Sequence, residues 1–470
     1  MQMERCTTAP QVDPSLIRAF FADCAAAGAD LHTLLIEKDG ELLVRAAKMP
    51  YSCADVREVY SVTKSFTSVA IGTLWDDRLL SFEERLCDIF PESVPQEPCQ
   101  EALAVRVCDL LSMQAGQPAC SMAQVEYAAN PVSTFFAQPF DRMPGTYMVY
   151  NTACSCMLGE IVRKKTGEEL FDYLTRRVFA PLGITNVRMN TTCSGASEAG
   201  AGLQISADDL LKFGEMLLGG GLYRGRRIVS EAYLHMASTV HADTSGRWDN
   251  ADANAGYCWH FWKNSVGGYR ADGSDGQFVL VFPEQHTVAV LQSYTPQVQV
   301  LLDRIYALLP RLLCAKGDRS APMPTEPVPD AGTITLQSGV YRLQQNPCGF
   351  TQLTLSRQED AVCLTFSDGT ALQSLQAGCG YFKISEITAP YYRPKLYPIL
   401  RHSVIEKTVT AACCEQTEQG LVLHLYHKSC PHPARMMVQT DAKKLTITMD
   451  ANGRFDPSAC ELHGTWIAPC

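Results

Sequence analysis

The chain has 470 residues, of which 46% are hydrophobic and 19% charged, and its formal net charge is −10. A chain of this length can bury a large core, and we expect about two or three domains. The acidic balance argues against nucleic acid or an anionic membrane as a partner, and because no apolar run reaches the roughly 18 residues needed to span a bilayer, we expect a soluble protein.

The N-terminus and the cysteines indicate the compartment. The first residues lack the apolar core of a secretory signal, which favours a cytoplasmic location. The 20 cysteines are scattered without regular spacing, and some, such as Cys154 and Cys156, lie inside apparent secondary structure. In a chain without an export signal they are best interpreted as reduced, small core residues.

The N-terminal region predicts a helix followed by a hairpin. Asp13-Pro14 opens an amphipathic segment that reaches about Ala27, and proline is favourable in a first helical turn because its missing N–H has no partner there. The apolar segments 31–36 and 41–46 flank Lys38-Asp39-Gly40 and predict two strands joined by a turn.

The stretch Ser61-Val62-Thr63-Lys64 precedes a long apolar run and is typical of nucleophilic catalysis. On a helix, side chains three residues apart lie on one face, so the Lys64 amine can reach the Ser61 hydroxyl. Serine is a poor nucleophile until a base removes its proton, and lysine can be that base only where burial or positive charge disfavours its ammonium form. The positive end of the helix dipole opposes protonation of Lys64 and stabilises negative charge on the Ser61 oxygen. Because Ser-x-x-Lys occurs about once by chance in such a chain, later segments must support it.

Five later segments give this support through their order along the chain. They are residues 77–84, 105–116, 144–152, 202–214 and 271–278. With the Ser61 segment they resemble, over residues 15–312, the superfamily of class C β-lactamases, D-alanyl-D-alanine peptidases and related esterases. The resemblance implies an α/β (α+β) β-lactamase-like serine hydrolase domain, in which an antiparallel sheet is flanked by helices and accompanied by a helical subdomain.

The resemblance also implies roles for individual residues. Ser61 would be the nucleophile that forms the acyl-enzyme, and Lys64 the base that activates it. Tyr150 occupies the tyrosine of the family's Tyr-x-Asn motif, where its phenol would pass the proton to the leaving group and later activate water. The backbone N–H groups of Ser61 and Ser274 would form the oxyanion hole, and Gly273 would let its strand approach the substrate closely.

Two departures from the family pattern bear on the substrate. Thr152 stands where the family has an asparagine that contacts the substrate and steadies the lysine, so this amide is lost or replaced by that of Asn151. Ala271 stands where the family has a lysine or histidine, so a cation that would face a substrate carboxylate is lost.

The neighbours of Ala271 leave two interpretations open. Asp272 and Asp275 would repel an anion, unless Arg270, next to Ala271, compensates their charge; otherwise Arg270 is a solvated surface residue. We therefore expect a substrate-binding segment at 270–273, together with Asn151 and Thr152, that favours neutral or cationic esters and amides over β-lactams.

The remaining elements complete a hydrolase domain at residues 1–314. Ser206-Ala207-Asp208-Asp209 predicts the start of a helix that ends at the glycines 219–221. Residues 277–293 predict two strands about a turn at 283–285, and leucines at helical spacing predict a helix over 296–313.

The C-terminal third differs in composition. Four prolines between residues 315 and 332 predict an extended linker. Beyond it, short β-rich segments separated by Gly, Asp and Asn predict an all-β barrel or sandwich at 333–470, with a lipocalin-like barrel favoured.

One cluster in this domain has residue types found in zinc sites, namely His424, His427, Cys430 and His432. On a strand, His424 and His427 would face opposite sides, so packed or solvent-facing histidines are the better interpretation. We expect no metal and no cofactor.

Three functional classes follow. The first is a cytoplasmic serine hydrolase that forms an acyl-enzyme on a small ester or amide. The second is a β-lactamase or D-alanyl peptidase, disfavoured by Ala271 and by the absence of an export signal. The third is a catalytically impaired relative that only binds ligands. The oligomeric state does not follow from the sequence.

Overall fold

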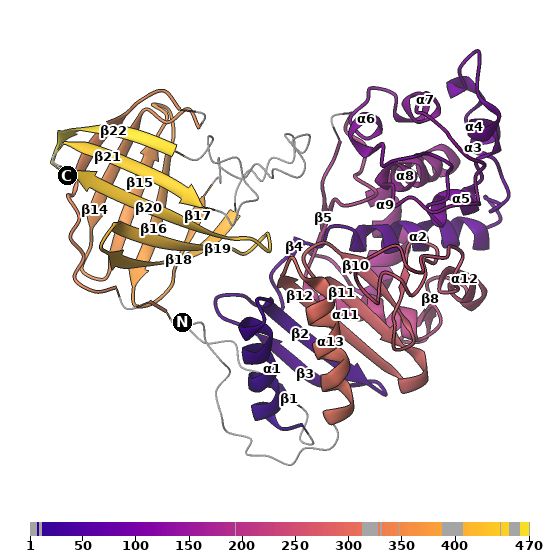
Figure 1. The fold of residues 1–470 in the computed structure, drawn as a ribbon, viewed down its shortest axis with the longest axis horizontal. Helices are drawn as coiled ribbons and strands as arrows, with labels where there is room; N and C mark the ends of the chain where they lie inside the picture. Colours follow the sequence, from indigo (N-terminus) through magenta and orange to yellow (C-terminus); the bar gives the residue numbers. More distant parts are fainter. Residues whose placement is uncertain are drawn as a thin grey trace. The chain divides into compact units, whose positions relative to one another are not determined.

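The computed structural model describes residues 7–8, 12–192, 194–312, 328–329, 331–346, 348–387, 408–441, 443–450 and 461–469. The chain divides into two compact units, Met1–Pro324 and Thr325–Cys470 (Figure 1). Most of the predicted linker at 315–332 lies outside the described residues.

The first unit is built on an antiparallel sheet of seven strands. Their spatial order is β1 (Thr7–Thr8), β3 (Glu41–Ala47), β2 (Asp30–Lys38), β12 (Thr287–Tyr294), β11 (Gln277–Phe282), β10 (Tyr269–Gly273) and β9 (Trp262–Lys263). The predicted N-terminal hairpin is β2 with β3, and the predicted strands after residue 277 are β11 and β12. Strands from both ends of the unit meet in the middle, where β2 pairs with β12.

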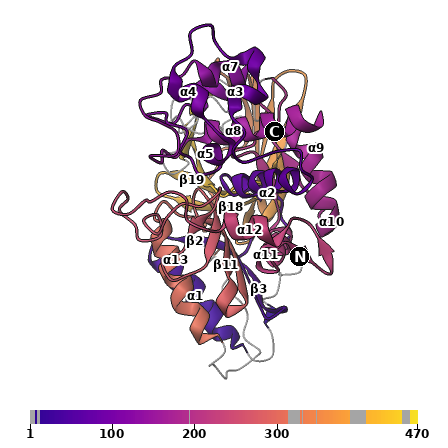
Figure 2. The same ribbon diagram turned by 90° about the vertical axis from the view of Figure 1, so that its right-hand side faces the viewer.

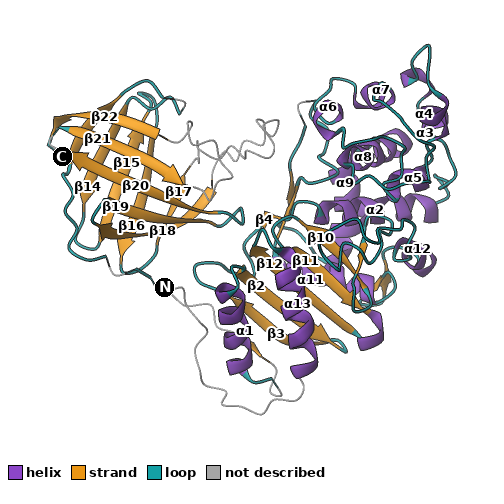
Figure 3. Cartoon of the chain, viewed as in Figure 1, coloured by secondary structure: helices purple, strands orange, loops and turns teal. Residues whose placement is uncertain are grey.

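Helices cover both faces of this sheet (Figure 3). Helices α1 (Pro14–Ala26) and α13 (Val298–Leu308) pack with Phe278 and Leu280 of β11. Helices α2 (Val62–Asp76) and α11 (Ala207–Leu218) pack with Val279 and Val281, which point to the other face. All four helices were expected from the sequence, and Ser206 caps α11 by accepting from the Asp209 N–H at 3.1 Å.

Helix α2 lies between the sheet and a helical subdomain in two perpendicular views (Figures 1 and 2). That subdomain and its surroundings contain α3 (Leu86–Ile89), α4 (Gln100–Ala104), α5 (Val107–Leu111), α6 (Met122–Val125), α7 (Pro131–Phe136), α8 (Thr152–Thr166), α9 (Leu170–Leu174), α10 (Ala180–Leu182) and α12 (Glu231–Ala237). Short turns of other helix types occur at Pro91–Ser93, Thr175–Phe179, Pro283–Gln285 and Leu309–Arg311. Two small sheets pair β4 (Arg57–Glu58) and β5 (Arg188–Met189) with β6 (Leu203–Ile205), and β7 (Leu222–Tyr223) with β8 (Arg226–Arg227).

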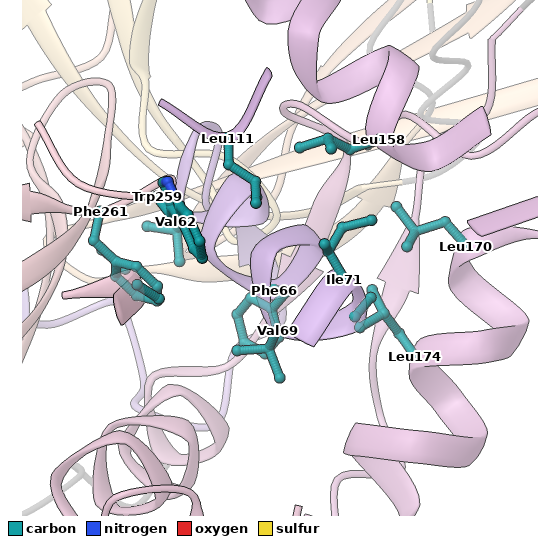
Figure 4. Close-up of a cluster of buried hydrophobic side chains, with 14 of the residues drawn as sticks. Val62, Phe66, Val69, Ile71, Leu111, Leu158, Leu170, Leu174, Trp259 and Phe261 are labelled. Atoms are coloured by element: carbon teal, nitrogen blue, oxygen red, sulfur yellow. The ribbon is translucent and has the colours of Figure 1, made fainter. Parts of the chain in front are cut away.

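Residues 62–74 of α2 are all buried. Apolar side chains of α2 meet those of neighbouring segments in Figure 4, which labels Val62, Phe66, Val69, Ile71, Leu111, Leu158, Leu170, Leu174, Trp259 and Phe261. The hydroxyl groups of α2 donate to carbonyl oxygens of other segments: Ser65 to His260 at 2.8 Å, Thr67 to Ala199 at 2.7 Å and Ser68 to Trp259 at 2.8 Å. A helix with this many polar side chains can be buried because each of these groups is satisfied.

The second unit is the predicted all-β barrel. Its strands are β13 (Gly339–Leu343), β14 (Gln352–Arg357), β15 (Ala361–Ser367), β16 (Leu372–Cys379), β17 (Lys383–Ile387), β18 (Thr408–Thr417), β19 (Gly420–His427), β20 (Pro433–Asp441), β21 (Lys444–Asp450) and β22 (Glu461–Ala468). A parallel pairing of β16 with β18 closes a ring of nine strands, where a lipocalin has eight, and β17 pairs only with β18. Alternate residues such as Leu421, Leu423 and Leu425 fill the interior.

Two histidines of the barrel lie close to polar side chains of the neighbouring strand β18. His424 Nε2 lies 3.2 Å from Glu415 Oε1, and His427 Nδ1 lies 2.9 Å from Thr410 Oγ1. Among the described residues no group of three or more His, Cys, Asp or Glu side chains could hold a metal ion. The 15 cysteines in these ranges are all free thiols, and no helix there is long and apolar enough to cross a membrane.

Candidate active site

The structure brings Ser61 and Lys64 together at the start of α2. Ser61 is the residue directly before the first helical residue, and Lys64 Nζ lies 3.0 Å from Ser61 Oγ. Ser61 is half-buried, while Lys64 is only 2% exposed. The preceding residue, Tyr60, has φ of 46°, a left-handed conformation that is costly for a residue with a side chain and is common at functional sites.

A second bond fixes the Lys64 amine. Its Nζ donates to the Gly200 carbonyl at 2.7 Å. A Cβ atom on residue 200 would lie 2.3 Å from Thr152 Cγ2, so glycine is required for this close approach. The Gly200 carbonyl thus supplies the anchor that we expected to be missing with Thr152 in place of asparagine. Sequence reasoning missed Gly200 because a backbone carbonyl leaves no residue-type signal.

The environment of Lys64 favours its neutral, basic form. Burial lowers the pKa of Lys64 to about 8, and the negative charge of Glu126 acts in the opposite direction. Glu126 is 2% exposed, and its Oε1 has no hydrogen-bond partner among the described residues. Burial raises the pKa of Glu126 to about 7, while Lys64 opposes that rise. Two groups whose pKa values are close to neutrality therefore lie near the nucleophile, which is typical of a catalytic site.

Tyr150 lies beside this pair, directly before the first turn of α8. Lys64 Nζ is 5.2 Å from the centroid of the Tyr150 ring. The ring stacks on Trp262 at 5.8 Å and meets the edge of Tyr257 at 6.0 Å. These contacts hold the three predicted catalytic side chains, those of residues 61, 64 and 150, in one place.

His260 completes the wall behind Lys64 without adding charge. Its Nδ1–H donates to the Leu111 carbonyl at 2.8 Å, and its Nε2 accepts from the Ser155 hydroxyl at 2.9 Å. Burial, with a further contribution from Lys64, lowers the pKa of His260 to about 3. A neutral histidine is compatible with a nearby lysine that must lose its proton.

The expected oxyanion donors lie at the junction of α2 and β10. A Cβ atom on Gly273 would lie 2.2 Å from the Val59 carbonyl oxygen, so only glycine lets the end of β10 lie against the segment before Ser61. Within the described part of the chain, neither the Ser61 N–H nor the Ser274 N–H donates a hydrogen bond. Both are thus available to an oxygen atom of a substrate.

The side chain of Asn151, which we expected to contact the substrate, is bound within the protein. Its Oδ1 accepts from the N–H groups of Ser121 at 3.1 Å and Ala153 at 3.0 Å, and its Nδ2 donates to Gln117 Oε1 at 2.7 Å. The side chain is buried, caps α8 and fixes the loop at 117–121. Thr152, the first residue of α8, contributes a methyl group against Gly200.

Of the two interpretations of Arg270, the solvated surface residue was wrong, and compensation of Asp272 was confirmed. The Arg270 side chain is 3% exposed, so it is not a surface residue. Its Nε donates to Asp272 Oδ2 at 2.8 Å, and one of its terminal nitrogens lies 3.5 Å from Asp252 Oδ1. Arg270 is therefore not free to bind a substrate anion, and it also compensates the charge of Asp272. Ala271 points to the opposite face and is fully buried.

Known proteins with similar sequences are hydrolases of one family. The Beta-lactamase family model matches residues 16–309. The chain is 28% identical to lovastatin esterase of Penicillium rubens over 34% of its length and 46% of that protein, so it spans about half of that relative. It is 24% identical to 6-aminohexanoate-dimer hydrolase of Paenarthrobacter ureafaciens, over 56% of this chain and 72% of that protein.

A solved structure extends the likeness in fold to nearly the whole chain. The octameric penicillin-binding protein homologue from Pyrococcus abyssi matches with a TM-score of 0.52 at 17% identity, over 96% of this chain and 99% of the other. At this identity the match concerns the fold alone.

Proposed function

Because this chain belongs to the Beta-lactamase family, we propose that it is a serine hydrolase that cleaves a small ester or amide through an acyl-enzyme on Ser61. The observation that carries the proposal is the 3.0 Å approach of a buried lysine amine to the Ser61 hydroxyl oxygen. A buried lysine whose pKa is lowered to about 8 has a minor neutral fraction at neutral pH that can act as a base, and this one has a serine within hydrogen-bond distance.

In the acylation step Ser61 Oγ attacks the carbonyl carbon of the substrate while neutral Lys64 takes the Ser61 proton. The carbonyl oxygen becomes negatively charged and accepts from the N–H groups of Ser61 and Ser274. When the bond to the leaving group breaks, the departing alcohol or amine takes a proton from the Tyr150 hydroxyl, and Lys64 returns its proton to Tyr150. The products of this step are the acyl-enzyme and the free alcohol or amine.

Deacylation follows the same path in reverse with water as the nucleophile. Tyr150 and Lys64 take a proton from water, the resulting hydroxide attacks the ester carbonyl of the acyl-enzyme, and the oxyanion donors act again. The Ser61 oxygen leaves with the proton, and the acid product is released.

The experiment combines covalent labelling with turnover. Wild type and Ser61→Ala are incubated with a fluorophosphonate and with a panel of p-nitrophenyl esters and p-nitroanilides. We expect the wild type to be labelled at Ser61 and to release p-nitrophenol, and Ser61→Ala to do neither. The ratio of ester to anilide turnover then separates an esterase from an amidase.

Two other outcomes would replace this proposal. Rapid turnover of nitrocefin with little ester hydrolysis would favour a β-lactamase. Saturable ester binding without labelling of Ser61 would favour a relative that binds ligands but has lost its chemistry.

A further inference from the structure

Aromatic rings extend outward from Tyr150 along one side of the candidate active site. Tyr150 stacks on Trp262 with ring centroids 5.8 Å apart, and Trp262 meets Trp248 edge to face at 6.3 Å. Trp248 is 43% exposed. A large aromatic side chain with this much exposed surface, continuous with a candidate catalytic residue, provides an apolar surface for a ligand.

Arg247, next to Trp248, forms no ion pair with a carboxylate of the described residues. It donates to the Met148 carbonyl at 2.6 Å, two residues before Tyr150, and its guanidinium lies 4.1 Å from the centroid of the Tyr147 ring. Exposed Asp243 on the same loop has a lowered pKa, chiefly because it accepts from Ser245 at 2.9 Å and to a smaller extent because of the charge of Arg247. The half-buried guanidinium keeps most of its N–H groups for another acceptor.

Arg142 provides an internal comparison. It stacks on the same Tyr147 ring at 4.6 Å, but both of its contacts to Asp141 measure 2.6 Å. Arg142 is therefore held in a bidentate ion pair, whereas Arg247 is not.

The loop that carries Arg247 and Trp248 is fixed before any ligand binds. Asn254 Oδ1 accepts from the N–H groups of both residues at 3.0 Å. Further along the loop, buried Asp252 accepts from Tyr306 at 2.7 Å and lies 3.5 Å from Arg270. Arg270 thus anchors the loop, and a fixed guanidinium loses little entropy on binding an anion.

We propose that Arg247, Trp248 and Trp262 form a substrate subsite that binds an aromatic or extended apolar group bearing a carboxylate. This inference rests on the proposed function and names its substrate class. In this subsite Arg247 would provide the positive charge that is missing at Ala271. The enzyme would then prefer anionic substrates, whereas the sequence suggested neutral or cationic ones. Because Arg270 compensates Asp272, that carboxylate does not oppose the arrangement.

The test uses two pairs of esters that differ only in charge. In the first pair the charge is on the leaving group: 4-(butanoyloxy)benzoate and its methyl ester. In the second it is on the acyl group: mono-4-nitrophenyl glutarate and 4-nitrophenyl pentanoate. We expect wild type to show a higher kcat/KM for the anionic member of at least one pair, and that pair identifies the side of the scissile bond that Arg247 faces.

Three variants assign the effect to the subsite. Arg247→Gln is expected to lower kcat/KM about tenfold for the preferred anionic ester and less than about twofold for its neutral partner, since a charged hydrogen bond is lost. Arg142→Gln, at the other cation stacked on Tyr147, is expected to change neither by more than about twofold. Trp248→Ala is expected to lower kcat/KM for both the anionic ester and its neutral partner.

A binding measurement separates failure of the subsite from failure of the proposed function. Tryptophan fluorescence of Ser61→Ala is titrated with 4-(butanoyloxy)benzoate and with mono-4-nitrophenyl glutarate, and we expect Arg247→Gln in this background to raise the Kd of the preferred ligand about tenfold. If wild type is labelled and hydrolyses esters, yet Arg247→Gln changes charged and neutral esters equally and leaves both Kd values unchanged, the subsite is refuted and the hydrolase stands. If nothing is labelled or hydrolysed, the hydrolase is refuted and the Kd values alone decide on Arg247.

Discussion

The two sides of the candidate site differ in how closely they keep the family pattern. On the nucleophile side, Ser61 and Lys64 are both present at the start of the largely buried helix α2, and their side chains meet at 3.0 Å. On the substrate side, Ala271 is a buried alanine where the family has a lysine or histidine, and the cation that we propose in its place is Arg247, on the loop at 244–256. The difference indicates that breaking a bond requires particular atoms at fixed positions. Substrate recognition requires only a surface of suitable charge and shape, which different residues can provide.

The largest expected effect tests the nucleophile side. Ser61→Ala removes the oxygen that attacks the substrate, and we expect kcat/KM to fall by at least about 10⁴-fold. Ser274→Ala is the control, because only the backbone N–H of Ser274 is used and its side chain is exposed; it should stay within about threefold of wild type. Equal losses in both variants would mean that the two serines do not have these different roles.

The next effect tests the anchor of the substrate side. Arg270→Met leaves buried Asp252 and half-buried Asp272 without their cation, and we expect the free energy of unfolding to fall by about 3 kcal/mol in chemical denaturation. Arg85→Gln breaks an Arg–Asp pair of similar geometry in which both side chains are 52% exposed, and no measurable change is expected. A stable Arg270→Met protein would show that the loop does not depend on this ion pair.

A smaller effect tests the carbonyl that holds Lys64. In Gly200→Ala the new Cβ would collide with Thr152 Cγ2 at 2.3 Å and displace the carbonyl, so we expect kcat/KM to fall roughly ten- to a hundredfold. Adding Thr152→Ser removes this methyl group and should restore part of the activity. A double variant no better than Gly200→Ala would place the damage elsewhere.

The smallest effect concerns pH. Catalysis requires neutral Lys64, so kcat/KM should rise with pH through the pKa of Lys64, which is about 8. The charge of Glu126 raises this pKa, so in Glu126→Gln the pKa of Lys64 falls and the rise in kcat/KM moves to lower pH. Because the pKa of Glu126 is itself about 7, the effect is expected where that carboxyl is ionised and Lys64 is still mostly protonated, and activity between the two pKa values should increase by up to about fourfold. Glu160→Gln, in which the lost carboxylate pairs with Arg163 instead, should leave the profile in place. An unchanged profile in Glu126→Gln would show that Glu126 does not influence the base.

Sequence reasoning located the nucleophile side because its signal is local. A serine and a lysine three residues apart on a helix must share a face, whatever the rest of the chain does. The same holds for the Ser206 cap of α11 and for the hairpin of β2 and β3, which are set by neighbours in sequence.

The substrate side could not be predicted because its contacts are long-range. Arg270 and Asp252 are 18 positions apart in the sequence. Arg247 donates to the Met148 carbonyl, which is 99 positions away. Glu126 and Gly200 also meet Lys64 only through the tertiary fold, and neither belongs to a motif. The closure of the barrel has the same cause: β16 and β18 pair in parallel around β17, a connection that strand-by-strand patterns do not encode.

The hydroxyl groups of α2 also determine how activity is lost on heating. They bind carbonyl groups of the segments around residues 199 and 260, so no part of the helix can open while those segments remain folded. We expect the amide hydrogens of α2 to exchange with deuterium only through global unfolding of the first unit. Thermal inactivation and cooperative melting of that unit should therefore occur together, without an inactive folded intermediate.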